Sequence, residues 1–436
     1  ALGTADVTVN GNVDGTLGGV AATEESKITV NGDVDSDGVG ALATDKGEVV
    51  VNGDVKGGEV GVAAEGESTV KVEGDVAGKD GAEQGGYGVV STENAQVEVA
   101  GDVKGGNAES DTDQAVGGTG VIAAGESEVT VGGSVQGGDA KNDTVAMAGD
   151  GVGIEATADV TVKGDVKGGN AASKKQAVAG DGVVVLCLKA QDEEAKQAGK
   201  LVIEGSVSGG QAQGEDAIQG SALYYFFNQT QVPEDIIIPK LDSTSGQTLV
   251  DSLDGYLDGL IAYLEEISGE SVSPEDSEAL HQSFTDILVQ LVLINHPDAV
   301  IADEQALISF LDTLPAEERA LYASVFTDAI KAAYDPLVKQ INVEILSQYL
   351  RPTVTVHALK TENGAEAVSS DMGAFMNELL SAEINYIVRV LPSENGVLTV
   401  DKETAKAGET ITITAKANEG YRVSKVFVNG EALQGK

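Results

Sequence analysis

The nine residues Val49–Gly57, VVVNGDVKG, represent a motif that recurs along the first half of the chain and decides its fold. Eight copies begin at residues 7, 28, 49, 70, 97, 129, 160 and 201. The first four copies start 21 residues apart, and the later ones start 27 to 41 residues apart. Self-similarity at such a period is typical of a repeat architecture, in which each unit stacks on its neighbours.

Apolar and polar residues alternate inside each copy, as in Val7-Thr8-Val9, and this is the period of a β-strand. A glycine follows the strand, for example Gly11 or Gly53, and we expect it to turn a corner with positive φ. The next valine, such as Val13 or Val55, then points inward on a new face, so that 21 residues hold two or three short strands separated by glycine corners. The repeat therefore predicts a parallel β-solenoid with coils of about 21 residues over residues 1–240, because hairpins would need tight turns between strands of similar length.

The longer coils carry extra residues that enter at one point, after the motif closes. They are Asn107–Thr119, Asp139–Asp150 and Asn170–Asp181, and we expect them to project from one edge of the rod. The aromatic run Ala222–Asn228, ALYYFFN, predicts a plug that closes the core, with a ligand-stacking platform as the alternative. Ile236–Pro239 would then be the last strand, since proline suits an edge position.

Glycines become rare after residue 240 and the apolar spacing becomes helical. Leu249, Leu253, Tyr256 and Leu257 follow the i, i+3, i+4 pattern of an amphipathic helix, and Ser273-Pro274 is a favourable helix start. Four or five such helices predict an all-α bundle over residues 241–350. We interpret the apolar stripes as core, although a partner groove would use the same pattern.

Residues 351–391 predict a small α/β connector, with a strand, a helix and a second strand. Residues 386–436 are then all β in pattern. The segments NGVLTV (395–400), AKAGETITITA (405–415) and NEGYRVSKVFVNG (418–430) resemble the divergent InlB B-repeat family of Gram-positive surface proteins. That resemblance covers about 50 residues and implies an extracellular or cell-wall location and a spacer or adhesion role. The solenoid is similar to repeat regions of bacterial adhesin-like surface proteins.

The composition excludes several classes of protein. The 71 acidic residues outnumber the 27 basic ones, for a net charge of −44, and residues 1–318 contain no arginine. Nucleic-acid binding depends on basic contacts to phosphate, so we expect none. No stretch of 18 apolar residues is present, which argues against a membrane span in this segment. The single cysteine, Cys187, cannot form an intrachain disulfide, and we interpret it as a small buried hydrophobe.

The sequence begins inside a repeat. Residues 4–9, TADVTV, recur at 157–162, where they follow a Gly-Val segment that is mostly missing ahead of residue 4. An incomplete coil would leave unpaired backbone groups, which favour end-to-end association. We therefore expect further coils or a cap upstream in the full-length protein.

Few residues are suited to catalysis. His281, His296 and His357 are the only histidines, and none lies at metal-ligand spacing from another His or Cys, so neither a zinc site nor a hydrolytic triad is expected. The solenoid lacks Arg and Trp, which weakens the case for sugar turnover. Aspartates recur with the repeat, as expected of a solvated corner. We therefore predict no catalytic residues and no enzyme activity.

Calcium is the one cofactor that the acidic loops suggest. Stacked carboxylates repel one another, and Ca²⁺ binds through oxygen ligands. The candidate ligands are Asp111, Asp113, Asp139 and Asp143, with solvated acidic loops as the simpler interpretation.

The whole pattern favours a non-catalytic protein that is secreted or attached to the wall of a bacterium, with a role in adhesion or display. Its partner would be a host or bacterial surface protein or a glycan. One alternative is a carbohydrate-active β-helix enzyme, which would need paired acids and a basic residue in a concave groove. Another is a purely mechanical stalk, which would need only a smooth rod.

Overall fold

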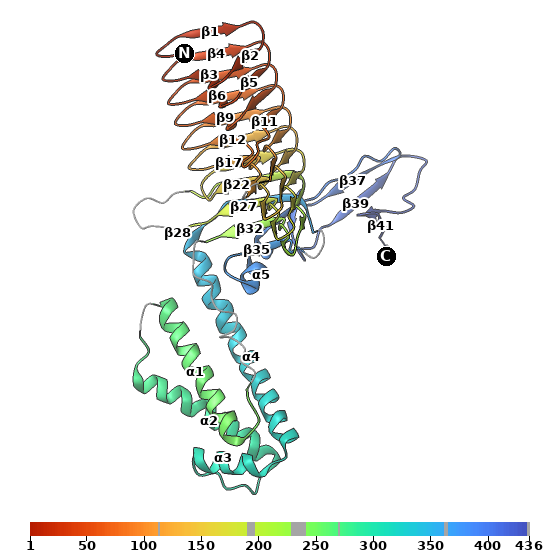
Figure 1. The fold of residues 1–436 in the computed structure, drawn as a ribbon. Helices are drawn as coiled ribbons and strands as arrows, with labels where there is room; N and C mark the ends of the chain where they lie inside the picture. Colours follow the sequence, from red (N-terminus) through yellow and green to blue (C-terminus); the bar gives the residue numbers. More distant parts are fainter. Residues whose placement is uncertain (112–113, 190–196, 228–240, 269–270, 362–364, 434–436) are drawn as a thin grey trace. The chain divides into compact units, whose positions relative to one another are not determined.

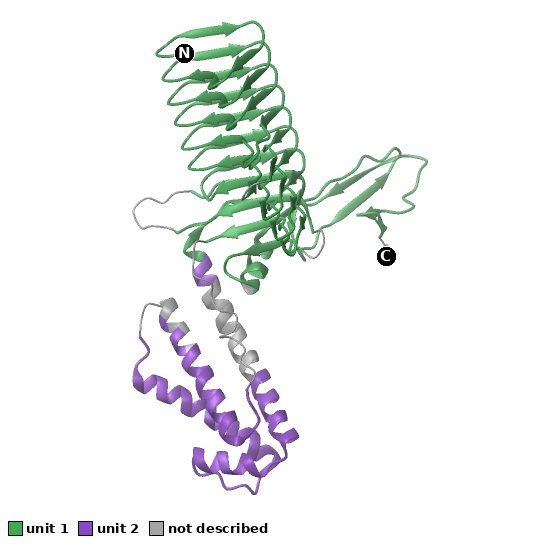
Figure 2. Cartoon of the chain, viewed as in Figure 1, with its two compact units in different colours: residues 1–230, 347–436 green, residues 231–346 purple. Residues whose placement is uncertain are grey.

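The computed structural model describes residues 1–111, 114–189, 197–227, 241–268, 271–361 and 365–433 (Figure 1). The chain divides into two compact units (Figure 2). The first joins residues 1–230 with residues 347–436, and the second comprises residues 231–346. We call them the solenoid unit and the helical unit.

Each coil of the solenoid unit contributes three short strands, as in β7 (Glu48–Val51), β8 (Val55–Gly57) and β9 (Val60–Ala64). Every strand pairs in parallel with its equivalent in the next coil, so that Val49 lies beside Val70 and Val51 beside Val72. The predicted stack of parallel strands is therefore confirmed (Figure 1).

The equivalent strands of the other coils form two long sheets. The first strands are β1 (Asp6–Val9), β4 (Lys27–Val30), β10 (Thr69–Val72), β13 (Gln96–Val99), β18 (Glu128–Val131) and β23 (Asp159–Val162). The second strands are β2 (Val13–Gly15), β5 (Val34–Ser36), β11 (Val76–Gly78), β14 (Val103–Lys104), β19 (Val135–Gln136) and β24 (Val166–Lys167), and β29 (Lys200–Ser208) spans both positions. The third strands are β3 (Gly18–Ala22), β6 (Val39–Ala43), β12 (Tyr87–Ser91), β17 (Val121–Ala123), β22 (Val152–Glu155), β27 (Val183–Leu186) and β32 (Leu223–Phe226).

The motif glycines are required for a different reason from the one predicted. Among the eight, only Gly11 has a positive φ, of 138°. A Cβ atom on Gly53 would lie 2.2 Å from the Asp33 carboxylate and 2.7 Å from the carbonyl carbon of Gly32 in the preceding coil. Glycine is therefore needed because the stacked backbones approach too closely for any side chain.

The extra residues of the longer coils do not simply project from the rod. They form two further four-stranded parallel sheets, which we call the alanine lobe. One sheet contains β15 (Ala108–Ser110), β20 (Ala140–Asn142), β25 (Ala171–Ala172) and β30 (Ala212–Gln213). The other contains β16 (Ala115–Val116), β21 (Val145–Met147), β26 (Gln176–Val178) and β31 (Asp216–Ile218). Buried alanines fill the space between the sheets, so the lobe has a small core of its own.

The chain returns to the solenoid after the helical unit. β34 (Thr353–Lys360) pairs in parallel with β29, and β35 (Val368–Ser370) pairs in parallel with β32. Residues 351–391, for which we expected a separate connector, thus include two strands that extend the solenoid sheets. The aromatic run does not end the stack, because its strand β32 pairs in parallel with β35 of the next coil. The segment Ile236–Pro239, for which we expected the last strand, lies outside the described residues.

Several short elements complete this last coil. They are β28 (Leu188–Lys189) with its antiparallel partner β33 (Tyr349–Leu350), helix α5 (Ala374–Glu383), and β36 (Asn385–Ile387) with its antiparallel partner β38 (Thr404–Lys406). Beyond them, β37 (Gly396–Val400) pairs with β39 (Ile413–Ala417), and β40 (Phe427–Val428) pairs with β41 (Glu431–Ala432).

The helical unit contains α1 (Gly246–Ser268), α2 (Pro274–Asn295), α3 (Glu304–Thr313) and α4 (Ala316–Ser347). As expected from the sequence, Ser273 caps α2 and accepts a hydrogen bond from the backbone N–H of Asp276. Helices α1 to α4 share one hydrophobic cluster, to which Leu257, Leu288 and Phe326 contribute. No helix in the described part of the chain is both long and apolar enough to cross a membrane.

Candidate functional site

The recurring aspartates of the motif form a hydrogen-bonded ladder. The Oδ1 atom of Asp33 accepts the backbone N–H of Asp54 at 3.0 Å, and Asp54 accepts that of Asp75 at 2.9 Å. Asp75 and Asp102 continue the series, with distances of 2.8 and 2.7 Å. Each carboxylate is thus stabilised by a donor from the next coil, which offsets the repulsion expected between stacked charges. The role of these aspartates is structural.

Asp139 belongs to a second ladder of the same kind. Its Oδ1 accepts the backbone N–H of Asn170 at 2.7 Å and the side-chain amide of Asn170 at 3.0 Å. Asn107 on one side and Gln211 on the other extend this series through the longer coils. This calcium candidate therefore already has two donors on one of its oxygens.

The remaining calcium candidates are spread out. Asp143 pairs with the Lys174 ammonium at 2.6 Å. Asp111 is exposed, and Asp113 lies outside the described residues. Within the described ranges, no three His, Cys, Asp or Glu side chains are grouped so that they could hold a metal ion. The structure thus does not bring the three described candidates, Asp111, Asp139 and Asp143, together as a set of ligands.

Asp150 and Asp181 form an unpredicted stacked pair of partly buried carboxylates. The Oδ1 of Asp150 accepts the backbone N–H of Asp181 at 2.8 Å, and Asp181 accepts that of Ser221 at 2.6 Å. Burial raises the pKa of Asp150 to about 6. Burial, together with the neighbouring charge of Asp150, raises the pKa of Asp181 to about 7.

Two histidines pair with carboxylates in the helical unit. The Nδ1 of His281 lies 3.0 Å from an Asp254 oxygen, and its Nε2 lies 3.2 Å from an Asp258 oxygen. The Nε2 of His296 lies 2.6 Å from a Glu318 oxygen. None of these contacts includes a nucleophilic side chain. We therefore interpret both pairs as contacts that join neighbouring helices.

A groove of about 550 Å³ runs between the second strands of the solenoid and the alanine lobe. Its walls include Glu109, Asp139, Lys141 and Lys167. An acid beside a base in a concave surface is what a carbohydrate-active enzyme would need. Here Glu109 pairs with Lys141 at 2.5 Å, and Asp139 accepts the hydrogen bonds of its ladder. Both acids in the groove therefore have structural partners.

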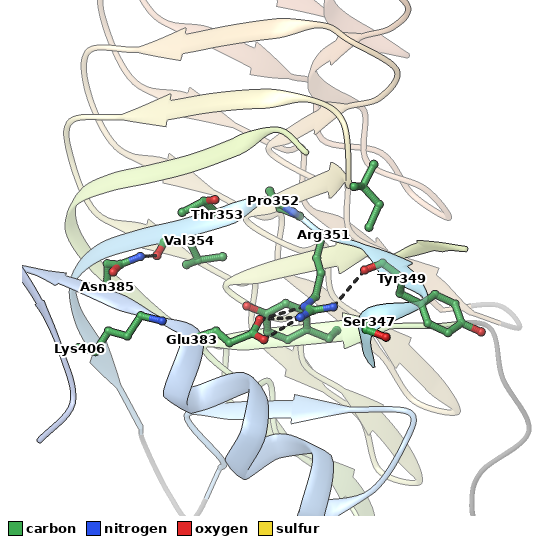
Figure 3. Close-up of a pocket in the computed structure, with 11 residues that line it drawn as sticks. Ser347, Tyr349, Arg351, Pro352, Thr353, Val354, Glu383, Asn385 and Lys406 are labelled. Carbon is green, nitrogen blue, oxygen red and sulfur yellow. Dashed lines mark hydrogen bonds and ion pairs between the residues drawn. The ribbon is translucent and has the colours of Figure 1, made fainter. Parts of the chain in front are cut away.

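A second hollow, of about 410 Å³, lies at the last coil of the solenoid unit (Figure 3). We call it the end cavity. Strands β32, β33, β34, β36 and β38 and the end of α5 supply its walls. Its apolar lining includes Tyr225 and Val354, and its polar lining is Ser347, Arg351, Thr353, Glu383, Asn385 and Lys406.

Arg351 and Glu383 form a rigid pair in the end cavity. The Nη2 of Arg351 lies 2.7 and 2.9 Å from the two Glu383 oxygens, and its Nε donates to one of them at 3.0 Å. The Nη1 donates to the carbonyl of Tyr349 at 3.0 Å (Figure 3). The Arg351 side chain is 16% exposed, so this bidentate pair is held in one orientation at the cavity wall.

Asn385 and Lys406 lie directly opposite each other in the antiparallel pair β36–β38. Opposite residues of such a pair project from the same face, so both side chains reach the end cavity. The Asn385 amide donates to the carbonyl of Val354 at 3.3 Å. The Lys406 ammonium has no ion pair within the described residues. The cavity lining therefore holds two cations against one carboxylate.

Cys187 lies next to this region and is buried, as predicted. Burial raises the pKa of its thiol to about 12, and the nearby Arg351 charge offsets only part of that effect. Because the thiolate is the nucleophilic form, this side chain is inert at neutral pH.

The sequence did not predict the end cavity. Its residues come from segments separated by as many as 181 positions, from Tyr225 to Lys406, and no motif connects them. The one available signal was the scarcity of arginine: Arg351 is one of four in the chain. Tyr225 belongs to the aromatic run for which a ligand-stacking platform was the alternative.

Comparison of the chain with protein-family models, with curated proteins and with solved structures found no match in any of the three.

Proposed function

We propose that this protein is a non-catalytic scaffold on the surface of a bacterium, which displays binding modules on a rigid solenoid. The observation that carries the proposal is the continuity of the solenoid across the helical unit. Strands β34 and β35 pair in parallel with β29 and β32, which precede the insertion in the sequence. The helical unit is thus a module inserted between two consecutive coils.

The hydrogen bonding supports a structural role for the rod. The acidic side chains that recur along it accept backbone N–H groups from the next coil, through the ladders of Asp54 and Asp139. A catalytic acid or base must be able to exchange a proton with substrate, and it is tuned for this by its surroundings. The repeated aspartates are instead used to hold one coil on the next.

The finer assignments belong to the same proposal. We infer that α1 to α4 form a helical bundle, and that residues 386–436 are a spacer module of the B-repeat type. A secreted or wall-attached location follows from that resemblance. A purely mechanical stalk explains the inserted helical unit less well, because a spacer needs no second module within its rod.

Antibodies raised against the chain test the location. They should label intact cells of the source bacterium, and brief treatment of those cells with protease should remove the label. Labelling that appears only after the cells are lysed would contradict the proposal.

Incubation with acidic and neutral polysaccharides, with and without Ca²⁺, tests the absence of catalysis. No new reducing or unsaturated ends should form. Turnover of a polysaccharide that is lost in the variant Glu109→Gln would instead support a carbohydrate-active enzyme, because Glu109 lines the groove beside the alanine lobe.

A further inference from the structure

We propose that the end cavity binds an acidic sugar unit, a uronic or sialic acid, through its carboxylate and hydroxyl groups. This inference rests on the proposed function, because it names the class of glycan that the displayed surface would recognise.

The shape of the end cavity suits a single sugar. Its volume of about 410 Å³ falls within the range of about 300–1,000 Å³ that is usual for small-molecule sites. Such sites combine an apolar floor with a few placed polar groups. Here Val354 and Tyr225, which are 4% and 3% exposed, contribute apolar surface, while Thr353, Asn385 and Lys406 are polar groups at the end of the coil.

The charges favour an anion. Arg351 is bound to Glu383 and to the Tyr349 carbonyl, so this pair forms a fixed part of the wall with little net charge. Lys406 adds a positive charge that forms no ion pair within the described residues, although Glu409 is near enough to interact with it electrostatically. The neighbouring lysine of the same module, Lys402, is instead paired with Glu409. An excess of one positive charge suits a ligand with one carboxylate.

The remaining polar groups that line the end cavity can form hydrogen bonds with the hydroxyl groups of a sugar. Tyr225 is 3% exposed and lines the cavity, and its hydroxyl forms no hydrogen bond with another described residue. A tyrosine hydroxyl at a cavity wall can both donate to and accept from a ligand hydroxyl. Thr353 adds a second hydroxyl, and the Asn385 amide can both donate and accept. A hydroxylated acid would satisfy these groups together with Lys406.

The test is isothermal titration of the full chain with N-acetylneuraminate and with galacturonate, and galactose serves as the neutral comparison. At least one acid should bind, and at least tenfold more tightly than galactose. Lys406→Gln should weaken that binding about tenfold, and Lys406→Arg should restore most of it. Tyr225→Phe removes one hydroxyl and should weaken binding about fivefold, the equivalent of one net hydrogen bond of about 1 kcal/mol.

Lys402→Gln is the matched control, because it removes a lysine of the same module that is not in the cavity, and it should leave binding unchanged. Unchanged melting of all variants would show that the fold is intact. If neither acid binds, if galactose binds equally well, or if Lys406→Gln has no effect, the inference is wrong. The proposed scaffold role is tested separately by surface labelling and by the lack of turnover, so the two can fail independently.

Discussion

The solenoid unit and the helical unit reach a compact core in opposite ways. In the solenoid the backbones of successive coils are in contact, about 4.8 Å apart, and small side chains fill a narrow interior. In the helical unit the backbones stay apart, and large side chains such as Phe284 and Phe326 fill the space between them. The difference implies that added atoms should damage the solenoid, whereas removed atoms should damage the helical unit.

The largest effect should come from a removal in the helical unit. Phe326 is 1% exposed and packs edge-on against Phe284, with ring centroids 6.2 Å apart. Phe326→Ala should lower the free energy of unfolding of this unit by about 3–5 kcal/mol, because it loses apolar contact and leaves a cavity. Thermal unfolding followed by the helical circular dichroism signal measures it.

Val325→Ala is the matched control, since Val325 is 41% exposed and lies next to Phe326 in the same helix. It should change the stability by less than about 0.5 kcal/mol. Equal effects of the two substitutions would show that the cluster does not hold the unit together.

In the solenoid, the damaging change should be the addition of a side chain where successive backbones are in contact. Gly53→Val would place a Cβ atom 2.2 Å from the Asp33 carboxylate and 2.7 Å from the backbone of Gly32. Overpacking of a dense interior costs about 1–3 kcal/mol, and we expect the upper end of that range because the backbone itself is in the way. The β-sheet circular dichroism signal should melt earlier, while the helical transition stays in place. A shift of the helical transition alone would contradict the separation of the two units.

Much of the solenoid could be predicted because its signal repeats. Each copy of the motif confirms the strand period and the position of the corner, so the register of Val49 with Val70 follows from alignment of the copies. The reason for Gly53 could not be predicted, because contact with a neighbouring coil is not visible in local sequence. The alanine lobe was missed because its strands are two or three residues long, too short to show a period.

The end of the solenoid was predicted less well than its middle. Residues 353–360 carry no Gly-Asp-Val motif and follow an insertion of more than 100 residues, so nothing in their pattern connects them to β29. The end cavity depends on that return of the chain. Its donors at Arg351, Asn385 and Lys406 come together only once the last coil is in place.

A pH-dependent effect should distinguish the partly buried pair Asp150 and Asp181 from the exposed aspartate ladder of the motif. The pKa of Asp181 rises on folding to about 7, so between about pH 4 and pH 7 the folded state binds more protons than the unfolded state. The free energy of unfolding should therefore fall as the pH rises through this window and level off above it. Asp150, whose pKa is about 6, adds to the same slope.

Asp181→Asn should remove the larger part of that slope. The amide oxygen can still accept the N–H of Ser221, but no charge is buried at high pH. One pKa unit corresponds to about 1.4 kcal/mol, and after allowance for partial exposure we expect a gain of about 2 kcal/mol at pH 8 and little change at pH 4. Urea unfolding at both pH values measures it, with the exposed ladder residue Asp54→Asn as control. A uniform loss of stability at both pH values would show that Asp181 is not a buried charge.

The smallest predicted effect has the opposite sign from that of Gly53. Gly255 lies in the middle of α1 and is exposed, and an added Cβ would have no atom of the described residues within 4 Å apart from its own helix backbone. Glycine in an exposed helix interior costs about 0.8–1.0 kcal/mol relative to alanine, so Gly255→Ala should stabilise the helical unit by about that amount. Gly246, at the start of the same helix, is the matched control, because an added Cβ would lie 2.4 Å from the carbonyl oxygen of Ile308. Gly246→Ala should destabilise the unit despite its better helix propensity. If both substitutions stabilise the helical unit, helix propensity outweighs the close approach of α1 to α3 at Gly246. Crowding of the backbone would then not explain where this chain needs glycine.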